Sequence, residues 1–224
     1  MDPLNFDNTL STALLLDAQD TLRHFKNEFH IPAQAGKPAI YFCGNSLGLQ
    51  PKRATAALQT ELATWQNLAV GGYFNGTNPW LYYQDYCKPT LAKLVGAGEK
   101  EVTVMNALTV NLHLMMLSFY RPTATRFKII MEAGAFPSDQ YAVETQVKHY
   151  GLDPENAIIE ITPRPGKKLL ETADILQAIH DHQDSLAPVV PDAINYYTRP
   201  LFHMQSIAAA AHDGGQLVGI NPAH

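Results

Sequence analysis

The sequence predicts an α/β protein with a mostly parallel sheet and flanking helices. From about residue 101 onward, apolar strand-like runs alternate with segments of helical periodicity, which is typical of repeated βα units. Hydrophobic residues make up 46% of the 224-residue chain and charged residues 17%, the balance of a packed globular protein. Ligands of such sheets bind beyond the carboxyl ends of the strands, so the residues that follow each strand are candidates for function.

The part before the alternation is predicted to be mostly helical. Apolar residues recur at roughly helical spacing at Leu10, Ala13, Leu14, Leu22 and Phe25, and potential caps precede them at Asp7, Asn8 and Thr9. Residues 52–69 are rich in Ala, Leu, Gln and Glu and predict a second helix. Residues 70–83 combine Gly, Asn and Pro with aromatic residues and predict a loop.

The alternating part contains five expected strands and four expected helices. The strands are expected at residues 101–106, 127–134, 156–163, 186–197 and 216–221, and the helices at 108–120, 137–151, 172–183 and 201–215. Gly151 is expected to close the second of these helices, and Thr172 to cap the third. Pro188 and Pro191 interrupt the fourth strand, which we therefore expect at a sheet edge or at a bulge.

Composition and motifs exclude several classes of protein. The net charge of −5 gives no reason to expect nucleic acid or an anionic membrane as partner. Cys43 and Cys87 lack metal-site spacing, and the chain has no HExxH, GxSxG, GxGxxG or P-loop motif. It also lacks a signal peptide and an apolar run long enough for a membrane span. We expect a cytoplasmic protein without a metal site.

Two strand exits carry residues suited to a ligand. Thr109 opens a helix directly after a strand, where free N–H groups and the helix dipole favour a phosphate. Phe136 could stack on a planar ring, with Ser138 and Asp139 as hydrogen-bonding groups. The alternative is that Asn106 or Thr109 caps the first helix, and that Ser138 or Asp139 caps the second near residue 140. Two such exits that face one crevice favour a ligand site.

Five segments along the chain carry a resemblance to a known family. They read YFCGNSLGLQPK, NALTVNLHLMMLSF, EAGAFPSDQYAVETQ, NYYT and VGINPAH, in this order. The chain resembles the N-terminal portion of kynureninase, a pyridoxal-phosphate enzyme of the aspartate-aminotransferase fold (fold type I). An alternative is a related desulfurase, but the AFPSD and SLGLQPK segments argue against it.

The resemblance implies an activity and a cofactor. Kynureninases hydrolyse L-kynurenine, or its 3-hydroxy form, to an anthranilate and L-alanine in tryptophan degradation and NAD biosynthesis. They use pyridoxal 5′-phosphate and are homodimers, so the resemblance implies kynurenine as substrate and a second copy as partner. The alternative is a non-catalytic remnant that binds at most the cofactor phosphate or a partner chain.

Five residues match cofactor-binding positions of the family. Leu108 and Thr109 match residues that bind the cofactor phosphate, and Phe136 matches the aromatic residue that stacks on its ring. Ser138 and Asp139 match further cofactor-contacting positions.

Five further positions align with site positions or site loops of the family, and four of them carry a different residue from the family pattern. Asp192 stands where the family has a small cofactor-contacting residue. Asn221 stands where the family motif FDLAH has the aspartate that pairs with the pyridine nitrogen, and His224 matches the histidine of that motif. Tyr73 stands where the family has a substrate-contacting histidine, and Arg199 alters the loop after NYYT. Since an amide cannot stabilise a positive charge as a carboxylate does, we expect a weakened site.

The resemblance also predicts the domain organisation. Residues 1–65 are expected to form N-terminal helices and a substrate-side turn, and residues 66–224 part of the cofactor-binding large domain. The family's Schiff-base lysine and its small C-terminal domain have no counterpart in the sequence, and no catalytic residue is assigned. We therefore expect an incomplete large domain and impaired activity.

Overall fold

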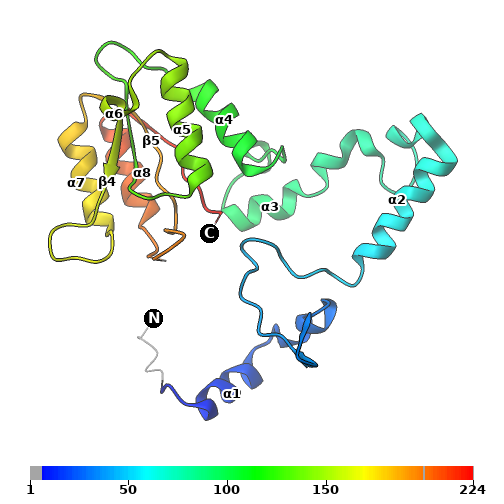
Figure 1. Cartoon of the computed structure of the whole chain (residues 1–224). Helices are drawn as coiled ribbons and strands as arrows, with labels where there is room; N and C mark the ends of the chain where they lie inside the picture. The colour runs from blue at the N-terminus through cyan, green and yellow to red at the C-terminus, as the bar shows by residue number, and fades with distance from the viewer. Residues whose placement is uncertain (1–6, 199, 224) are drawn as a thin grey trace. The chain divides into compact units, whose positions relative to one another are not determined.

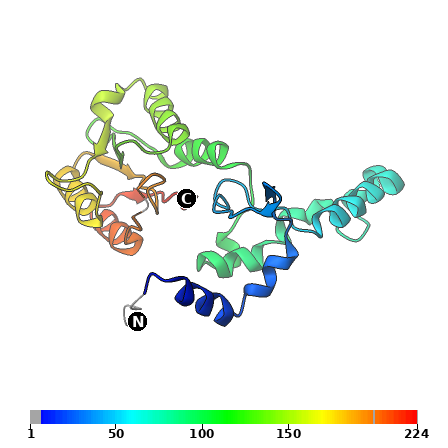
Figure 2. The ribbon, with the colours of Figure 1, turned by 60° about the horizontal axis from the view of Figure 1, so that its bottom comes forward.

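The computed structural model of the chain describes residues 7–198 and 200–223, and the chain divides into two compact units. Unit 1 spans Met1–Val102 and unit 2 spans Thr103–His224. Unit 1 is the helical part that runs from blue through cyan to the blue-green of α3 in Figures 1 and 2, and unit 2 is the part that runs from the green of α4 to red and is built around a sheet. The predicted boundary at residue 65 concerns the large domain of kynureninases and stays a prediction.

Unit 1 consists of short helices joined by loops. Its helices are α1 (Leu10–Gln19), α2 (Ala54–Leu68), α3 (Lys88–Val95) and the 3-10 helices η1 (Arg23–Glu28), η2 (Ala69–Tyr73), η3 (Trp80–Asp85) and η4 (Glu99–Glu101); β1 (Ala33–Gln34) and β2 (Lys37–Pro38) form an antiparallel pair. The second predicted α-helix is confirmed as α2, and the first is confirmed only as far as Gln19, because the segment that contains Phe25 is the 3-10 helix η1. Of the potential caps, Thr9 caps α1 by accepting the N–H of Thr12. The predicted loop at residues 70–83 contains parts of η2 and η3.

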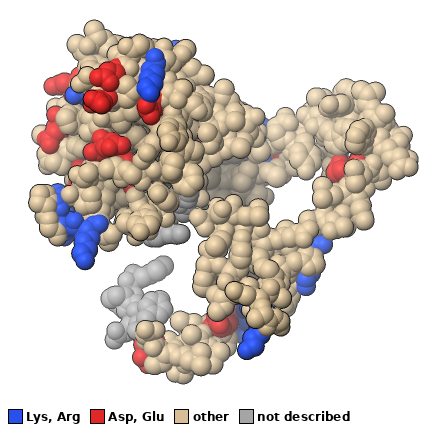
Figure 3. All heavy atoms as spheres, viewed as in Figure 1, with Lys and Arg blue, Asp and Glu red and all other residues tan. Residues whose placement is uncertain are grey.

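Few side chains of unit 1 are buried. Neither α1 nor α2 contains a buried residue, and Trp65 of α2 is 65% exposed. A packed contact does form around Glu61, whose carboxylate accepts hydrogen bonds from Asn78 Nδ2 (2.8 Å) and Trp80 Nε1 (2.7 Å). In Figure 3, few charged side chains interrupt the visible surface of this unit.

Unit 2 is built on a four-stranded parallel sheet. Its strands lie in the order β4 (Ile158–Ile161), β3 (Lys128–Glu132), β5 (Leu186–Val189), β6 (Leu217–Val218). One helix, α4 (Leu108–Phe119), precedes β3, and the helices between the strands are α5 (Pro137–His149), α6 (Pro154–Ala157), α7 (Thr172–His182) and α8 (Met204–Asp213). The predicted class, a mostly parallel sheet with flanking helices, is confirmed.

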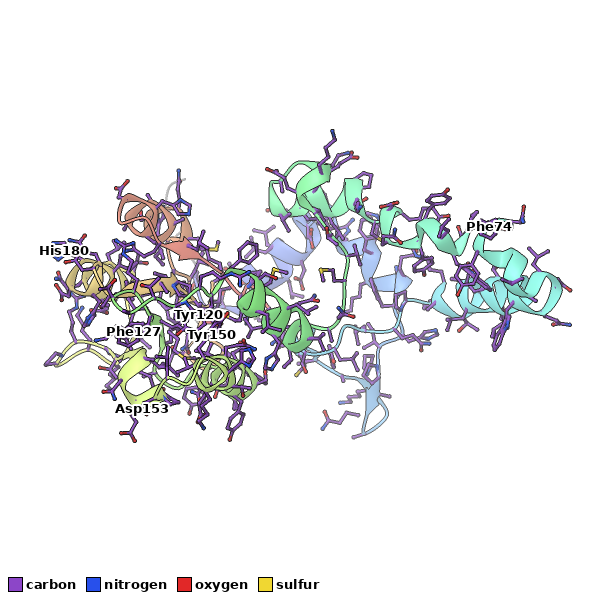
Figure 4. All side chains as sticks on the ribbon, turned by 90° about the horizontal axis from the view of Figure 1, so that it is seen from above. Phe74, Tyr120, Phe127, Tyr150, Asp153 and His180 are labelled. Atoms are coloured by element: carbon purple, nitrogen blue, oxygen red, sulfur yellow. The ribbon has the colours of Figure 1, made fainter. Side chains whose placement is uncertain are left out.

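Alternate residues of β3 pack into two separate cores, one on each face of the sheet. Ile130 packs against α7 and α8. Ile129 and Met131 pack on the other face, against α4 and α5. Tyr120 and Tyr150 lie together at the edge of this second core (Figure 4), and the Tyr120 hydroxyl donates to the carbonyl of Phe127 at 2.7 Å. A strand buried on both faces explains the continuous apolar run in the sequence.

The prolines of β5 are accommodated by a bulge. The pairing of β3 with β5 shifts between Lys128↔Leu186 and Ile130↔Val189, so β5 carries one extra residue around Pro188. β5 lies inside the sheet, because β6 pairs with its other side at Pro188 and Val189. Of the two predicted places for this strand, edge or bulge, the bulge is correct.

Two local predictions are wrong. Residues 101–106 do not form a strand: Glu101 ends η4, and no described strand lies beside residues 102–106 to supply ladder hydrogen bonds. Thr172 does not cap α7: the cap is Glu171, which exchanges hydrogen bonds with Asp174, while Thr172 Oγ1 accepts the N–H of His203. Gly151 does follow the end of α5 with a positive φ of 73°, as predicted. Among the described residues, no helix is both long and apolar enough to cross a membrane.

Candidate functional site

The carboxyl ends of β5 and β6 place Asp192 and Asn221 side by side. The two residues form a parallel bridge beyond the named strands. The Asn221 N–H donates to the Pro191 carbonyl (3.2 Å), and the Asn221 carbonyl accepts the N–H of Ala193 (2.8 Å). These backbone bonds fix two predicted cofactor residues as cross-strand neighbours.

Asp139 joins this pair from the first turn of α5. Asn221 Nδ2 donates to Asp139 Oδ2 at 2.7 Å, and both side chains are buried. Ser138 Oγ lies 3.3 Å from Asp139 Oδ1 and donates to it. Because α5 begins at Pro137 without a side-chain cap, the alternative that Ser138 or Asp139 is only a helix cap is wrong. A contact across 82 residues of sequence instead holds Asp139 in the site.

Asp192 is the most strongly perturbed acid of the site. Burial, together with the charges of Glu132 and Asp139, raises the pKa of its carboxyl to about 7, although a hydrogen bond from the Asn221 side chain opposes the shift. The residue is only 6% exposed, and its Oδ2 atom has no hydrogen-bond partner. A buried carboxylate oxygen without a donor is costly and suits a donor from a ligand.

Glu132 and Asn195 form a second buried polar contact that the sequence analysis missed. Asn195 Nδ2 donates to Glu132 Oε2 at 2.7 Å and so ties the end of β3 to the segment after β5. Asn195 Oδ1 accepts the backbone N–H groups of Tyr197 and Thr198. Burial raises the pKa of the Glu132 carboxyl. The available signals were a charged residue that ends an apolar strand and an asparagine that opens the NYYT segment.

Phe136 supplies an aromatic ring beside these polar groups. It precedes α5 directly, is 37% exposed, and meets Tyr196 edge to face with ring centroids 5.4 Å apart. An edge-to-face contact of this kind fixes the orientation of an aromatic ring.

The start of α4 lacks a side-chain cap. α4 begins at Leu108. The Asn111 side chain accepts the N–H of Asn106 and donates to the Asn106 carbonyl, so it does not bond the N–H groups of the first turn. Neither Asn106 nor Thr109 caps the helix, so that alternative is wrong. Leu108 and Asn221 line the same apolar cavity of about 310 Å³. The cavity therefore joins the α4 terminus to the strand ends.

Three predicted positions lie outside this group. Tyr73 belongs to unit 1, where its ring contacts Phe74 and Trp80. His224 and Arg199 lie outside the described residues. The structure thus joins Asp139, Asp192 and Asn221 directly.

The sequence is similar to curated kynureninases. It is 49% identical over 223 residues to the kynureninase of Myxococcus xanthus and 51% identical over 219 residues to that of Flavobacterium psychrophilum. The mouse kynureninase is 42% identical over 234 residues. The chain matches the N-terminal part of kynureninases. These alignments cover 98–99% of the chain, and it spans about half the length of the curated relatives it matches. No protein-family model matches it.

Solved structures support the same fold class. The cysteine desulfurase CsdA of Escherichia coli superposes with a TM-score of 0.63 at 16% identity, over 88% of this chain and 47% of that one. A C-DES variant with glycine covalently linked to its PLP cofactor gives 0.61 at 14% identity, over 82% and 46%. At such identities the likeness concerns the fold alone. The kynureninase similarity, at three times the identity, disfavours the desulfurase alternative.

Proposed function

We propose that the chain binds pyridoxal 5′-phosphate and provides the cofactor side of a kynureninase-type site. The observation that carries this proposal is the buried hydrogen bond between Asn221 and Asp139, with Asp192 as cross-strand neighbour. Three residues from separate parts of the chain meet at the carboxyl end of a parallel sheet, where ligands of this fold class bind. Sequence identity of 42–51% to kynureninases supports the assignment.

The residues present fit this cofactor. The uncapped N–H groups at Leu108 and Thr109 can hold a phosphate, and Phe136 can stack on a pyridine ring. The unpartnered oxygen of Asp192 can accept a hydrogen bond from a ring N–H. When bound, pyridoxal phosphate supplies an electron sink for negative charge that develops at the substrate α-carbon. The side chains described here bind and orient the ring and set its charge.

The substrate in this proposal is L-kynurenine or 3-hydroxykynurenine. Hydrolysis would give anthranilate or 3-hydroxyanthranilate together with L-alanine. Tyr73, in unit 1, is the proposed substrate contact and His224 a further cofactor contact. A non-catalytic chain that binds cofactor without turnover is the competing proposal, supported by the neutral Asn221 at the position where the resemblance implies an aspartate.

A binding titration followed by a turnover assay tests the proposal. Calorimetry with pyridoxal phosphate measures binding, and anthranilate fluorescence after addition of kynurenine measures turnover. We expect saturable binding that Phe136→Ala weakens about fivefold or more, because an aromatic contact is lost. Phe74→Ala, an exposed aromatic residue of unit 1, is the matched control and leaves binding unchanged. Absence of binding would refute the proposal, and binding without anthranilate would favour the non-catalytic alternative.

Two further assignments belong to the same proposal. We propose a homodimer in the cytoplasm. Exposed apolar side chains of unit 1, such as Trp65, and the outer edge of β6, which pairs only with β5 among described strands, offer surfaces for a second copy. Sedimentation analysis of the full chain should give twice the mass of one chain; a monomer at micromolar concentration would contradict the dimer.

A further inference from the structure

This inference rests on the proposed function and deepens it. We propose that Asp192, and not Asn221, supplies the carboxylate that pairs with the ring nitrogen of the bound cofactor. The negative charge then stands one strand away from Asn221, on its immediate neighbour in the sheet.

Asn221 is already committed to other groups. Its Nδ2 donates to Asp139 Oδ2 at 2.7 Å, and its Oδ1 accepts the N–H of Ala223 at 3.1 Å. The amide carries no charge, so it cannot hold a proton on a pyridine nitrogen by charge attraction. Asn221 is better described as a positioning residue that holds Asp139 and stands against Asp192.

Asp192 has what Asn221 lacks. Its side chain is more than nine-tenths buried, and its Oδ2 has no hydrogen-bond partner. It forms a parallel bridge with Asn221, and neighbouring strands lie only about 4.8 Å apart. A carboxylate moved from one strand end to the next therefore remains within reach of the same ligand.

The surroundings of Asp192 favour a cationic ligand. The charged groups that act on it are the carboxylates of Glu132 and Asp139. None of the ion pairs in the described part of the chain includes Asp192. A protonated ring nitrogen would supply both the missing donor and the missing positive charge.

Glu132 is the other acid with an unpartnered oxygen, at Oε1. Its Oε2 already accepts the amide of Asn195, and the residue is 2% exposed, at the end of β3. It is therefore the less suited of the two for a ligand. The competing explanation is that Asp192 only shares a proton with Glu132 and does not contact the cofactor. The test is designed to separate this structural role from the proposed one.

The test uses the full chain and pyridoxine 5′-phosphate labelled with ¹⁵N in its ring. This probe keeps the ring, hydroxyl and phosphate but has no aldehyde, so binding needs no lysine. The ¹⁵N chemical shift reports whether the ring nitrogen is protonated, and a titration gives the affinity. The variants are Asp192→Asn, Asp192→Ser and the double variant Asp192→Asn/Asn221→Asp. Glu160→Gln removes an exposed carboxylate of β4 as the control.

In the unsubstituted chain and in Glu160→Gln we expect the bound ring nitrogen to stay protonated to a higher pH than in free probe. Asp192→Asn and Asp192→Ser should lose that protonation and bind about tenfold or more weakly, as for loss of a charge-assisted hydrogen bond. The double variant should regain protonation. Unchanged protonation in a folded Asp192 variant would overturn the inference and leave the proposed function intact. A chain that does not bind the probe at all would overturn both.

Discussion

The two units of this chain differ in how they use their apolar residues. Unit 2 places them in two continuous cores on either face of the sheet, with Ile130 and Ile207 fully buried. Unit 1 is similarly rich in apolar side chains but exposes most of them, including Phe42 at 87% and Leu62 at 60%. Burial of apolar surface is the main favourable term in folding, so the stability of the chain resides in unit 2. The proposed site draws its rigidity from the same unit.

The comparison also explains where a precise site can form. Asp139, Asp192 and Asn221 stand at the ends of packed elements, and backbone and side-chain hydrogen bonds fix them. Tyr73 stands in a 3-10 helix of unit 1 and is 48% exposed. A side chain that binds a ligand is held more precisely by a packed scaffold than by an open one.

Truncation of an apolar side chain should show the largest difference in stability effect between the two units. Ile207→Ala, at a fully buried position in α8, should lower the free energy of unfolding by about 2–5 kcal/mol. Leu62→Ala, at an exposed position in α2, should change it by less than about 0.5 kcal/mol. Urea unfolding followed by circular dichroism measures both. Equal losses in the two variants would mean that unit 1 has a core of its own.

The pH dependence of stability should have opposite signs in the two units. In unit 2, the pKa of Asp192 rises from 3.8 to about 7 on folding. Its contribution to the free energy of unfolding is therefore fully present below pH 3.8 and is lost as the pH rises through 7. Burial raises the pKa of Glu132 in the same direction. In unit 1, hydrogen bonds from Asn78 and Trp80 lower the pKa of Glu61, so its contribution is present at neutral pH and is lost on acidification.

Asp192→Asn isolates the first of these effects. Between pH 4 and pH 7 the unsubstituted chain should lose stability relative to the variant by on the order of 1–3 kcal/mol. Unfolding curves at both pH values provide the measurement, with Glu160→Gln as a control for the loss of an exposed carboxylate. A difference between the chain and Asp192→Asn that does not depend on pH would show that Asp192 is not the perturbed acid.

A smaller effect is expected at the packed contact of unit 1. A methyl group at Gly72 would lie 2.8 Å from the ring of Trp80, while one at Gly71 would lie 3.7 Å from Leu68 Cβ. Gly72→Ala should therefore displace Trp80 at a local cost of about 1 kcal/mol and change the tryptophan emission. Gly71→Ala should leave the emission unchanged. The same spectrum for both would show that Trp80 does not pack on Gly72 in solution.

The sequence predicted most of unit 2 because its signals are local. Helical periodicity located α4 and α5, and apolar runs located β3 and β4 within a few residues. Residues 101–106 alternate as a strand does, yet a strand needs a partner, and pairing is not encoded locally. Pro188 restricted β5 to an edge or a bulge, and only the position of β6 decides between them.

The site was predicted in its residues but not in its contacts. Asp139 looked like a helix cap because a carboxylate in a first turn usually is one. Its bond to Asn221 spans 82 positions and follows only from the strand order. Glu132 and Asn195 were missed for the same reason, since neither has a polar neighbour in sequence that would mark a pair.

Hydrogen exchange with and without pyridoxal phosphate tests the central claim most directly, that the strand ends of unit 2 form the cofactor site. Cofactor should slow amide exchange in residues 107–111, 136–140, 192–195 and 219–223, around the residues that would hold it. Residues 10–68 of unit 1, remote in sequence from these segments, should exchange at the same rate in both conditions. Slowed exchange confined to unit 1, or no change at the four segments, would contradict the account.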